Sequence, residues 1–471
     1  MTASQNLDLQ RADRVAWPAR IAFGVGDFSL NLVWQGTALF LMFVYTDVLG
    51  IAPTIAGAIY LAAMVLDAVT DPIVAVFVER TRTRFGRYRP WLLAGCIPLA
   101  ISYPLAFSAP PGGVVDPVWW ALFTHLFLRM AYTVVGVPFS ALQARLTGDA
   151  NERARLAGFR MLGAACGGLG VVFVTPLLVD YFGPEREAEA YFVAASLAGL
   201  FTGLGLAYCA LVMREPAETG QGAVPSLISD LRSIPSMFLS NVPLMQVFAI
   251  ITVASICLGM FSKNVLYYFK YVAGREDLAI FALVMPAALL LVAVPGWVRL
   301  ATATSKSFAL QVGCLLAMIG YVAFWIVPAD QIALLFAAIA CIGLGSSALA
   351  VLFWSMLPDT VEYGEWKTGV RAEAKVFGFA TFAQKAAVGI NALLLGLLLN
   401  FSGFSANREQ APDTLFAMEV IMVGIPFLGA LTIALIARSY RLDKQLHDDI
   451  RRKLAGEVDA GHSASLARNA T

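Results

Sequence analysis

The stretch LAAMVLDAVTDPIVAVFVERTRTRFGRYRP, residues 61–90, decides the fold. Its first part, residues 61–78, is apolar and long enough to enter a lipid bilayer as a helix. Asp67 and Asp71 lie inside this apolar part, four residues apart, so they share one face of the predicted helix. A carboxylate inside a membrane is costly unless it has a partner or a function. We therefore interpret this face as a candidate cation site within a membrane helix.

The composition is that of a polytopic membrane protein. The 471 residues are 59% hydrophobic and 14% charged, roughly half the charged fraction of a typical soluble domain. So much apolar surface exceeds what one soluble core can bury. The formal net charge of +1, with basic residues spread over short loops, argues against a nucleic-acid partner. The sequence has no GxxxxGK[ST] phosphate-binding motif and no soluble catalytic signature, so we expect neither an ATP-driven pump nor an enzyme.

Twelve apolar segments are long enough to span a bilayer as helices. They cover residues 20–46, 54–78, 90–108, 117–141, 158–180, 189–213, 241–270, 277–299, 307–327, 331–356, 376–401 and 413–437. Basic residues gather in both tails and in alternate loops, whereas residues 108–117 and 327–331 contain no Lys or Arg. Because basic loops stay on the cytoplasmic side, we expect a multi-pass protein of the cell (inner) membrane with both termini in the cytoplasm.

The longest connection between apolar segments divides the twelve segments into two sets of six. We therefore predict an N-terminal six-helix bundle over residues 1–213 and a cytoplasmic connecting loop over 214–240. A C-terminal six-helix bundle over 241–438 and a cytoplasmic tail over 439–471 complete the predicted division. Two such bundles around a central cavity are typical of secondary transporters. The predicted fold class is thus an all-α membrane protein with twelve transmembrane helices in two bundles.

Several motifs occur in order along nearly the whole chain. They are FGVGDFSLN at 23–31, YTDVLG at 45–50, DAVTDP at 67–72, TRTRFGRYRPW at 81–91, PFSAL at 138–142, LPDTVEYGEWKTGVRAEA at 357–374 and FAQK at 382–385. On these motifs the chain resembles the glycoside–pentoside–hexuronide:cation symporters of the major facilitator superfamily, the group that includes melibiose permease. The resemblance implies the major facilitator fold and cotransport of a small, sugar-like solute with Na⁺, H⁺ or Li⁺.

The resemblance also implies a cation site on the second helix, completed from the fourth and eleventh helices. Asp67 and Asp71 fall on the two cation-site acids of the family. The resemblance places further cation-binding residues at Thr70, at the fourth-helix hydroxyl of Thr133, and at Lys385, which bridges the cation and sugar sites. It places sugar-site residues at Tyr132 and Arg160.

Three departures from the melibiose-type pattern change the charge of the predicted cavity. Acids of that branch on the first and fourth helices are replaced by Asn31 and Gly136, and Arg129 is added on the fourth helix. A more positive cavity suits a carboxylated or sulfonated sugar, since guanidinium groups bind such anions bidentately. The alternative is that Arg129 forms a fixed ion pair with Asp27 or Asp67.

Further substrate-binding candidates come from both halves of the chain. Asp27 and Asn31 are four residues apart on the first predicted helix and can face the cavity with Trp34 and Gln35. Aromatic and amide side chains together suit a sugar, because the sugar ring can stack on an aromatic ring and its hydroxyls can form hydrogen bonds with an amide. Candidates for the opposite wall are Trp354, Gln384 and Lys385.

The basic loop after the second predicted helix serves first as a cytoplasmic anchor. In the superfamily the corresponding loop also forms charge pairs that stabilise one conformation, which makes its residues gating candidates. These are Arg84 and Arg87, with acidic candidates Asp359, Glu362 and Glu365 in the predicted connection between the tenth and eleventh helices.

The predicted function is secondary active symport of a sugar or glycoside, including an acidic sugar such as a hexuronide, by alternating access. The coupling ion is Na⁺ or H⁺ at Asp67 and Asp71, held as a metal ion on hard oxygen ligands or as a proton on a carboxyl group. No other cofactor and no obligatory protein partner are predicted. The rival interpretations are a carrier of the same fold for a lipid-like or amphipathic solute, and a transporter-like sensor without net transport.

Overall fold

The computed structural model describes residues 15–453 apart from 114, 147–149, 214, 216–240, 370–372, 441, 443–445, 448 and 451. Within these residues the chain is almost entirely helical, and strand geometry is confined to an isolated bridge between Thr83 and Gly86. The predicted connecting loop 214–240 lies outside the described residues except for Glu215, as does the end of the predicted tail.

The helices follow the apolar segments closely. In the first half of the chain they are α2 (Trp17–Phe43), α3 (Pro53–Arg80), α4 (Arg89–Ala106), α5 (Pro117–Leu146), α6 (Ala150–Phe182) and α7 (Glu187–Val212). In the second half they are α9 (Val242–Val253), α10 (Gly259–Tyr267), α11 (Ala279–Ala303), α12 (Lys306–Ile326), α13 (Ile332–Thr368), α14 (Glu373–Phe401), α15 (Pro412–Glu419) and α16 (Ile425–Ser439). Short π-helical segments η1 (Val44–Val48), η4 (Ala254–Leu258), η5 (Tyr268–Val272) and η7 (Val420–Gly424) continue or join some of them.

Eleven helices of the described part are long and apolar enough to cross a membrane. The remaining predicted segment, 90–108, corresponds to α4, which begins at the charged Arg89 and contains Pro98 and Pro104. The predicted all-α membrane fold is therefore confirmed. One detail is wrong: α13 continues to Thr368, so the acidic gating candidates lie in its last turns and not in a connecting loop. Hydropathy marks where a helix leaves the lipid, but helical hydrogen bonds can continue beyond that point.

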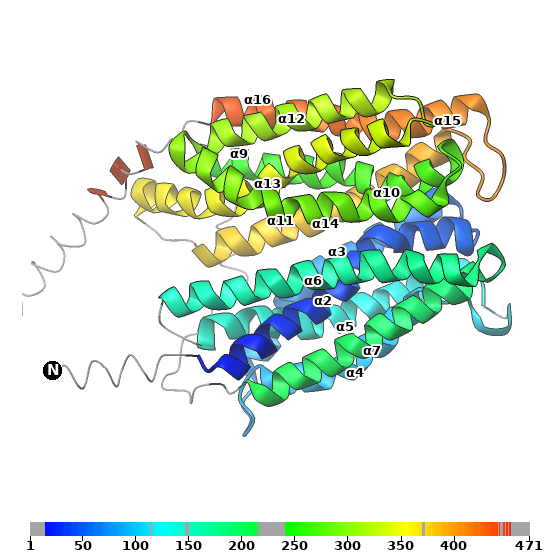
Figure 1. Cartoon of the computed structure of the whole chain (residues 1–471). Helices are drawn as coiled ribbons and strands as arrows, with labels where there is room; N and C mark the ends of the chain where they lie inside the picture. Colours follow the sequence, from blue (N-terminus) through cyan, green and yellow to red (C-terminus); the bar gives the residue numbers. More distant parts are fainter. Residues whose placement is uncertain are drawn as a thin grey trace, which may run out of the picture. The chain divides into compact units, whose positions relative to one another are not determined.

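The chain divides into two compact units. Unit 1 contains Met1–Val224, Ser262–Ala287 and Ala392–Met418, and unit 2 contains Pro225–Phe261, Ala288–Asn391 and Glu419–Thr471. In unit 1, α2 packs against α6 and α7, α3 packs against α5, and α4 packs against α5 and α7 (Figure 1). The predicted division into bundles 1–213 and 241–438 remains a prediction.

Glycines allow α2 and α6 to approach closely in unit 1. A Cβ atom added to Gly163 of α6 would lie 2.0 Å from the carbonyl oxygen of Gly24, and one added to Gly167 would lie 2.4 Å from that of Phe28. Small residues at such positions are how membrane helices gain backbone-to-backbone packing without a hydrophobic driving force. This contact fixes Asp27 on α2 opposite the start of α6.

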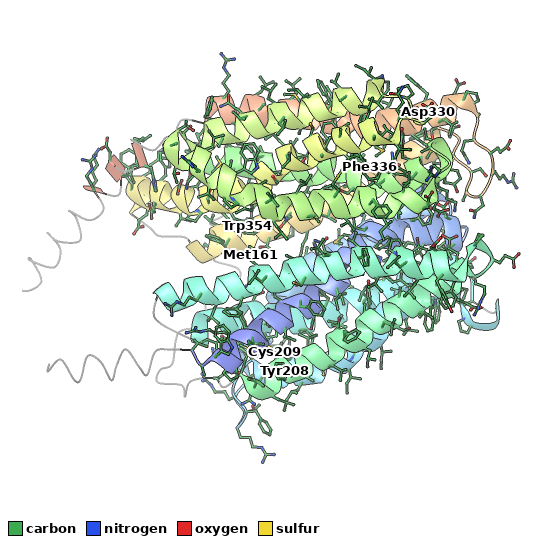
Figure 2. The ribbon with its side chains drawn as sticks, viewed as in Figure 1. Met161, Tyr208, Cys209, Asp330, Phe336 and Trp354 are labelled. Atoms are coloured by element: carbon green, nitrogen blue, oxygen red, sulfur yellow. The ribbon has the colours of Figure 1, made fainter. Side chains whose placement is uncertain are left out.

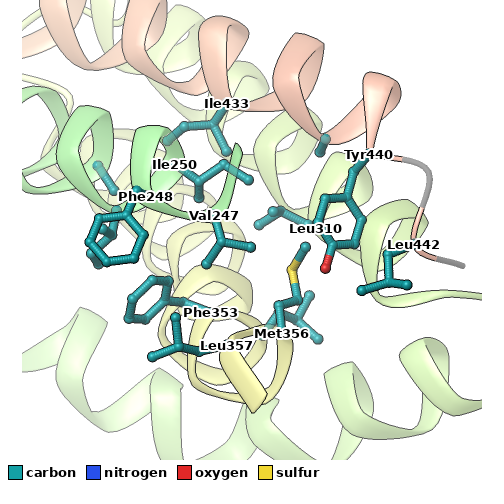
Figure 3. Close-up of a cluster of buried hydrophobic side chains, with 14 of the residues drawn as sticks. Val247, Phe248, Ile250, Leu310, Phe353, Met356, Leu357, Ile433, Tyr440 and Leu442 are labelled. Carbon is teal, nitrogen blue, oxygen red and sulfur yellow. The ribbon is translucent and has the colours of Figure 1, made fainter. Parts of the chain in front are cut away.

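Outward faces of the helices remain apolar, as lipid contact requires. On α7, Tyr208 is 41% exposed whereas the adjacent Cys209 is fully buried (Figure 2). The same helical turn therefore has Tyr208 on its outer face and Cys209 on its packed face. In unit 2, apolar side chains of α9, α12, α13 and α16 form a buried core that includes Val247, Leu310, Phe353 and Ile433 (Figure 3). Each unit thus has packed helices of its own.

A carboxylate fixes the basic loop of unit 1. Glu215 accepts hydrogen bonds from the backbone N–H groups of Arg87, Tyr88 and Arg89 at 2.7–2.8 Å. These groups are at the N-terminus of α4, where free N–H groups and the helix dipole favour an anion. Gly86, with a φ of 103°, leaves room for this carboxylate, since an added Cβ would lie 2.5 Å from it.

Candidate functional site

Three polar side chains of unit 1 converge where α3 packs against α5. Asp67 is fully buried, and Asp71, one turn along α3, is half-buried. The Thr133 hydroxyl of α5 lies 2.8 Å from Asp67 Oδ1 and 3.0 Å from Asp71 Oδ1. The structure therefore brings together the two predicted acids and the predicted fourth-helix hydroxyl.

The number of protons in this cluster has a chemical consequence. A threonine hydroxyl carries one proton, so Thr133 can donate a full hydrogen bond to Asp67 or to Asp71 but not to both. The second contact is met by sharing that proton between the two carboxylates, by a proton on one carboxyl group, or by a bound cation. Two carboxylate oxygens and a hydroxyl oxygen are also the hard ligands that cations such as Na⁺ prefer.

Thr70 lies beside the cluster on α3 but uses its proton elsewhere. Its hydroxyl contacts the carbonyl oxygens of Leu66 and Asp67 at 2.9 and 3.2 Å, within its own helix. Its oxygen retains lone pairs that can accept. Its predicted part in cation binding remains a prediction.

Asp27 of α2 is paired with Arg160 of α6. Arg160 Nη2 and Nε lie 3.1 and 3.3 Å from Asp27 Oδ1. Asn31 donates its amide to the Asp27 backbone carbonyl at 2.9 Å. Two predicted substrate-binding residues thus form an ion pair with each other, and the predicted alternative pair between Asp27 and Arg129 is not found among the described residues.

Arg129 lies in an aromatic environment. It is 2% exposed, and its guanidinium carbon is 5.4 Å from the ring centre of Trp34 and 6.0 Å from that of Tyr60. Its Nε donates to His125 Nε2 at a long 3.4 Å. The ring of Tyr132, one turn along α5, lies 5.9 Å from that of Trp34. The structure therefore groups three predicted substrate-binding residues, Trp34, Arg129 and Tyr132.

Lys263 of α10 joins this group and was missed by the sequence analysis. It is 6% exposed, its ammonium lies 4.2 Å from the ring centre of Tyr60, and it donates to the Ala38 carbonyl of α2 at 3.0 Å. The signal was present, because a lysine inside an apolar segment is a functional candidate by default. The seventh apolar segment, 241–270, contains it in the run GMFSKNVLYY.

The remaining substrate-binding candidates belong to unit 2. Trp354 of α13 is 41% exposed and lies edge-on to the ring of Phe353, with ring centres 5.0 Å apart. Gln384 and Lys385 are half-buried on α14. Their roles in a substrate site remain predictions.

The gating candidates have partners inside their own units. In unit 2, Asp359 pairs with Lys306 at 2.7 Å, and His447 lies 2.7 Å from Glu362 and 3.6 Å from Asp359. These candidates, together with Glu365, lie in the last turns of α13. In unit 1, the backbone of Arg87 is held by Glu215, and the Arg84 guanidinium lies 4.7 Å from the Phe85 ring centre.

A second polar cluster of unit 1, centred on Asp47, was also missed. Asp47 of η1 pairs with Lys270 at 3.3 Å and accepts a hydrogen bond from Tyr271. Asn407 donates to the Asp47 backbone carbonyl at 2.7 Å and accepts from Lys270 at 2.9 Å. Asp47, Lys270 and Asn407 also line a cavity of about 790 Å³. We call Asp47, Lys270, Tyr271 and Asn407 the Asp47 network.

Comparison with known proteins shows the family. Residues 22–444 match the family model of MFS/sugar transport proteins. The chain is 29% identical to the uncharacterized symporter YnaJ of Bacillus subtilis, over 94% of this chain and 96% of that protein. It is 28% identical to the isoprimeverose transporter of Lactiplantibacillus pentosus, over 99% of this chain and 96% of that protein.

A solved structure shares the fold. The crystal structure of the nucleoside transporter NupG superposes with a TM-score of 0.66 over 89% of this chain and 98% of that chain, at 12% identity. The family consists of membrane transporters, so the prediction that the chain is not an enzyme is confirmed. The chain belongs to the MFS/sugar transport protein family, within the glycoside–pentoside–hexuronide:cation symporter group of the major facilitator superfamily.

Proposed function

We propose that this protein is a secondary active symporter that couples uptake of a sugar or glycoside to a cation, Na⁺ or H⁺, by alternating access. The observation that carries the proposal is the position of the Thr133 hydroxyl between Asp67 and Asp71. Because a single hydroxyl proton lies between one buried and one half-buried carboxyl group, the cluster can accommodate a further positive charge. That charge is the coupling ion.

Coupling to the sugar runs through α5. Arg129, Tyr132 and Thr133 are three and four residues apart, so one side of this helix carries both the cation contact and substrate candidates. Binding of the cation draws Thr133 toward the two carboxylates and so orients Tyr132, which lies against Trp34. By linkage, the cation raises sugar affinity by the same factor as the sugar raises cation affinity.

A sugar fits the side chains that accompany the cation site. Trp34 and Tyr132 supply half-buried aromatic faces within reach of a sugar ring, and Gln35 supplies a half-buried amide. The isoprimeverose transporter and the family as a whole support the same substrate class. The proposed orientation has both termini in the cytoplasm, as the basic loops favour.

The test is uptake by the purified full-length protein in liposomes, across a panel of neutral and acidic sugars. Each sugar is measured with an imposed Na⁺ gradient and, separately, with an imposed pH gradient. Wild type is compared with Asp67→Asn and with Asp330→Asn, a control that removes an exposed carboxylate from the loop after α12 (Figure 2).

The proposal expects one gradient to drive accumulation of a sugar. Asp67→Asn should abolish accumulation while retaining exchange of unlabelled for labelled sugar, because the amide removes the cation charge site but not the sugar contacts. Asp330→Asn should accumulate sugar as wild type does. If neither gradient drives accumulation of any sugar, or if Asp67→Asn accumulates normally, the proposal is wrong.

A further inference from the structure

Resting on the proposed sugar symport, we propose that Arg129, Lys263 and His125 form a binding subsite for an anionic group on the substrate. The group is a carboxylate or sulfonate carried by the sugar. The carrier's preferred substrate is therefore an acidic glycoside, with Lys263 as a specificity-determining residue that the sequence did not single out.

Burial without acidic partners is the first observation. Arg129 is 2% exposed and Lys263 is 6% exposed. Among the described residues, neither side chain forms an ion pair with a carboxylate within 4.0 Å, and Asp27 of α2 is paired with Arg160. A buried cation is costly unless an opposite charge compensates it, and a substrate anion is a group that can do so.

Unused hydrogen-bond donors are the second observation. Arg129 has five N–H donors, of which Nε donates to His125, and the guanidinium also interacts with the Tyr60 hydroxyl. Lys263 uses one of its three donors on the Ala38 carbonyl. His125 is fully buried, and its Nδ1 has no hydrogen-bond partner among the described residues. Guanidinium, ammonium and imidazole donors together match the several oxygens of a carboxylate or sulfonate.

Aromatic rings lie against both cations. Lys263 lies 4.2 Å from the Tyr60 ring centre, and Arg129 lies over Trp34 at 5.4 Å and near Tyr60 at 6.0 Å. A ring face attracts a cation, most strongly when water is excluded, but more weakly than an anion would. A ring face attracts the charge without needing a directed N–H bond, so these contacts leave donors of both side chains available to an anion.

The charges of the two sites are balanced in a way that favours joint loading. When ionised, Asp67 and Asp71 together carry two negative charges, and Arg129 and Lys263, when protonated, carry two positive charges. One monovalent cation and one monoanionic sugar therefore leave the sum of the four side chains and two ligands at zero. Arg129 is one helical turn from Thr133, so both ligands share α5. Symport of one monovalent cation with one monoanionic sugar would then carry no net charge across the membrane.

The test compares three probes that differ in one substituent: methyl glucoside, methyl glucuronide and methyl sulfoquinovoside. Binding to purified protein is titrated by calorimetry, and uptake into liposomes is measured under the driving gradient. Wild type should prefer the glucuronide or the sulfonate over the neutral glucoside by about tenfold or more, as hydrogen bonds between charged groups imply. The two anionic probes distinguish carboxylate from sulfonate as the recognised group.

Substitutions identify the subsite as the source of that preference. Lys263→Gln and Arg129→Gln should each reduce the ratio of anionic to neutral affinity by about tenfold, while Lys263→Arg should retain most of it. Arg186→Gln, which removes an exposed guanidinium paired with Glu189, should keep the wild-type ratio. Where a glutamine variant does not fold, Lys263→Arg and Arg129→Lys still test the geometry. Arg129→Lys should reduce the ratio of anionic to neutral affinity by less than Arg129→Gln would.

The possible results separate the two proposals. A wild-type ratio of one or less, or a ratio that both glutamine variants leave unchanged, overturns the anionic subsite and leaves sugar symport standing if methyl glucoside accumulates. Absence of accumulation for all three probes overturns sugar symport, and the calorimetric ratio then still decides the subsite.

Discussion

Thr133 of α5 lies 2.8 Å from Asp67 of α3, and this contact joins the two helices through their buried polar groups. In a membrane, polar contacts of this kind hold helices together where apolar packing gives no preference over lipid. The same hydroxyl reaches Asp71 at 3.0 Å, so a single atom connects helix packing with the proposed coupling ion.

Replacing Thr133 by valine removes the hydroxyl and preserves the shape of the side chain. We expect Thr133→Val to raise the cation concentration for half-maximal uptake by about tenfold, because a hydrogen bond to a charged group contributes on the order of 1.5–3 kcal/mol. Thr124→Val is the matched control on α5, since the Thr124 hydroxyl contacts carbonyls of its own helix. Equal cation dependence of the two variants would contradict the role given to Thr133.

The ion pair between Asp27 and Arg160 should contribute to stability as a unit. We expect Arg160→Gln to lower the free energy of unfolding by about 1–3 kcal/mol, because it leaves the buried Asp27 carboxylate without this partner. The double variant Asp27→Asn/Arg160→Gln should lose less than the sum of the single losses. Denaturant titration in detergent measures all four proteins, and additive losses would show that the pair is not coupled.

Two glycines of α6 should respond in opposite ways to alanine. Gly163→Ala places a Cβ 2.0 Å from the Gly24 carbonyl oxygen, so we expect a loss of about 1–3 kcal/mol from overpacking. Gly158→Ala meets no atom within 4 Å, so the higher helix propensity of alanine should leave stability unchanged or raise it by up to about 1 kcal/mol. Thermal unfolding of both variants gives the comparison, and a stable Gly163→Ala protein would refute the close packing.

The Asp47 network should contribute far more to stability than a surface ion pair does. Asp47→Asn leaves Lys270, whose side chain is 16% exposed, without its carboxylate, and we expect a loss of about 1–3 kcal/mol. Asp277→Asn breaks an exposed pair with Arg275 and should leave the melting temperature within experimental error. A similar change in both variants would mean that the network is no more than a surface pair.

The fold was predictable because bilayer thickness sets the length of each apolar segment. Predicted bounds such as 54–78 and 189–213 differ from those of α3 and α7 by one or two residues. The extension of α13 to Thr368 was not predictable in this way, because a helix that continues into water has no hydropathy signal. The polar residues at its end therefore looked like a loop.

The cation site was also predictable, since two carboxylates four residues apart must share a helix face. The partner of each charged side chain was not predictable, because it depends on how the helices cross. Asp27 pairs with Arg160, 133 residues away, instead of with Arg129. The YTDVLG motif contains Asp47, but its partners Tyr271 and Asn407 are 224 and 360 residues further along the chain. Lys263 was visible as an intramembrane lysine, although nothing in the sequence connects it with Arg129.

The composition of unit 1 has a consequence for biosynthesis. Ser262–Ala287 and Ala392–Met418 belong to this unit together with the first 224 residues, and Asn407 completes the Asp47 network. Chains generally fold from the N-terminus while the ribosome is still translating. Here the six helices made first contain a buried carboxylate whose ammonium and amide partners are translated much later. The Asp47 network can therefore be completed only after residue 407 has been translated, and a nascent chain released before that residue lacks the Asn407 contact.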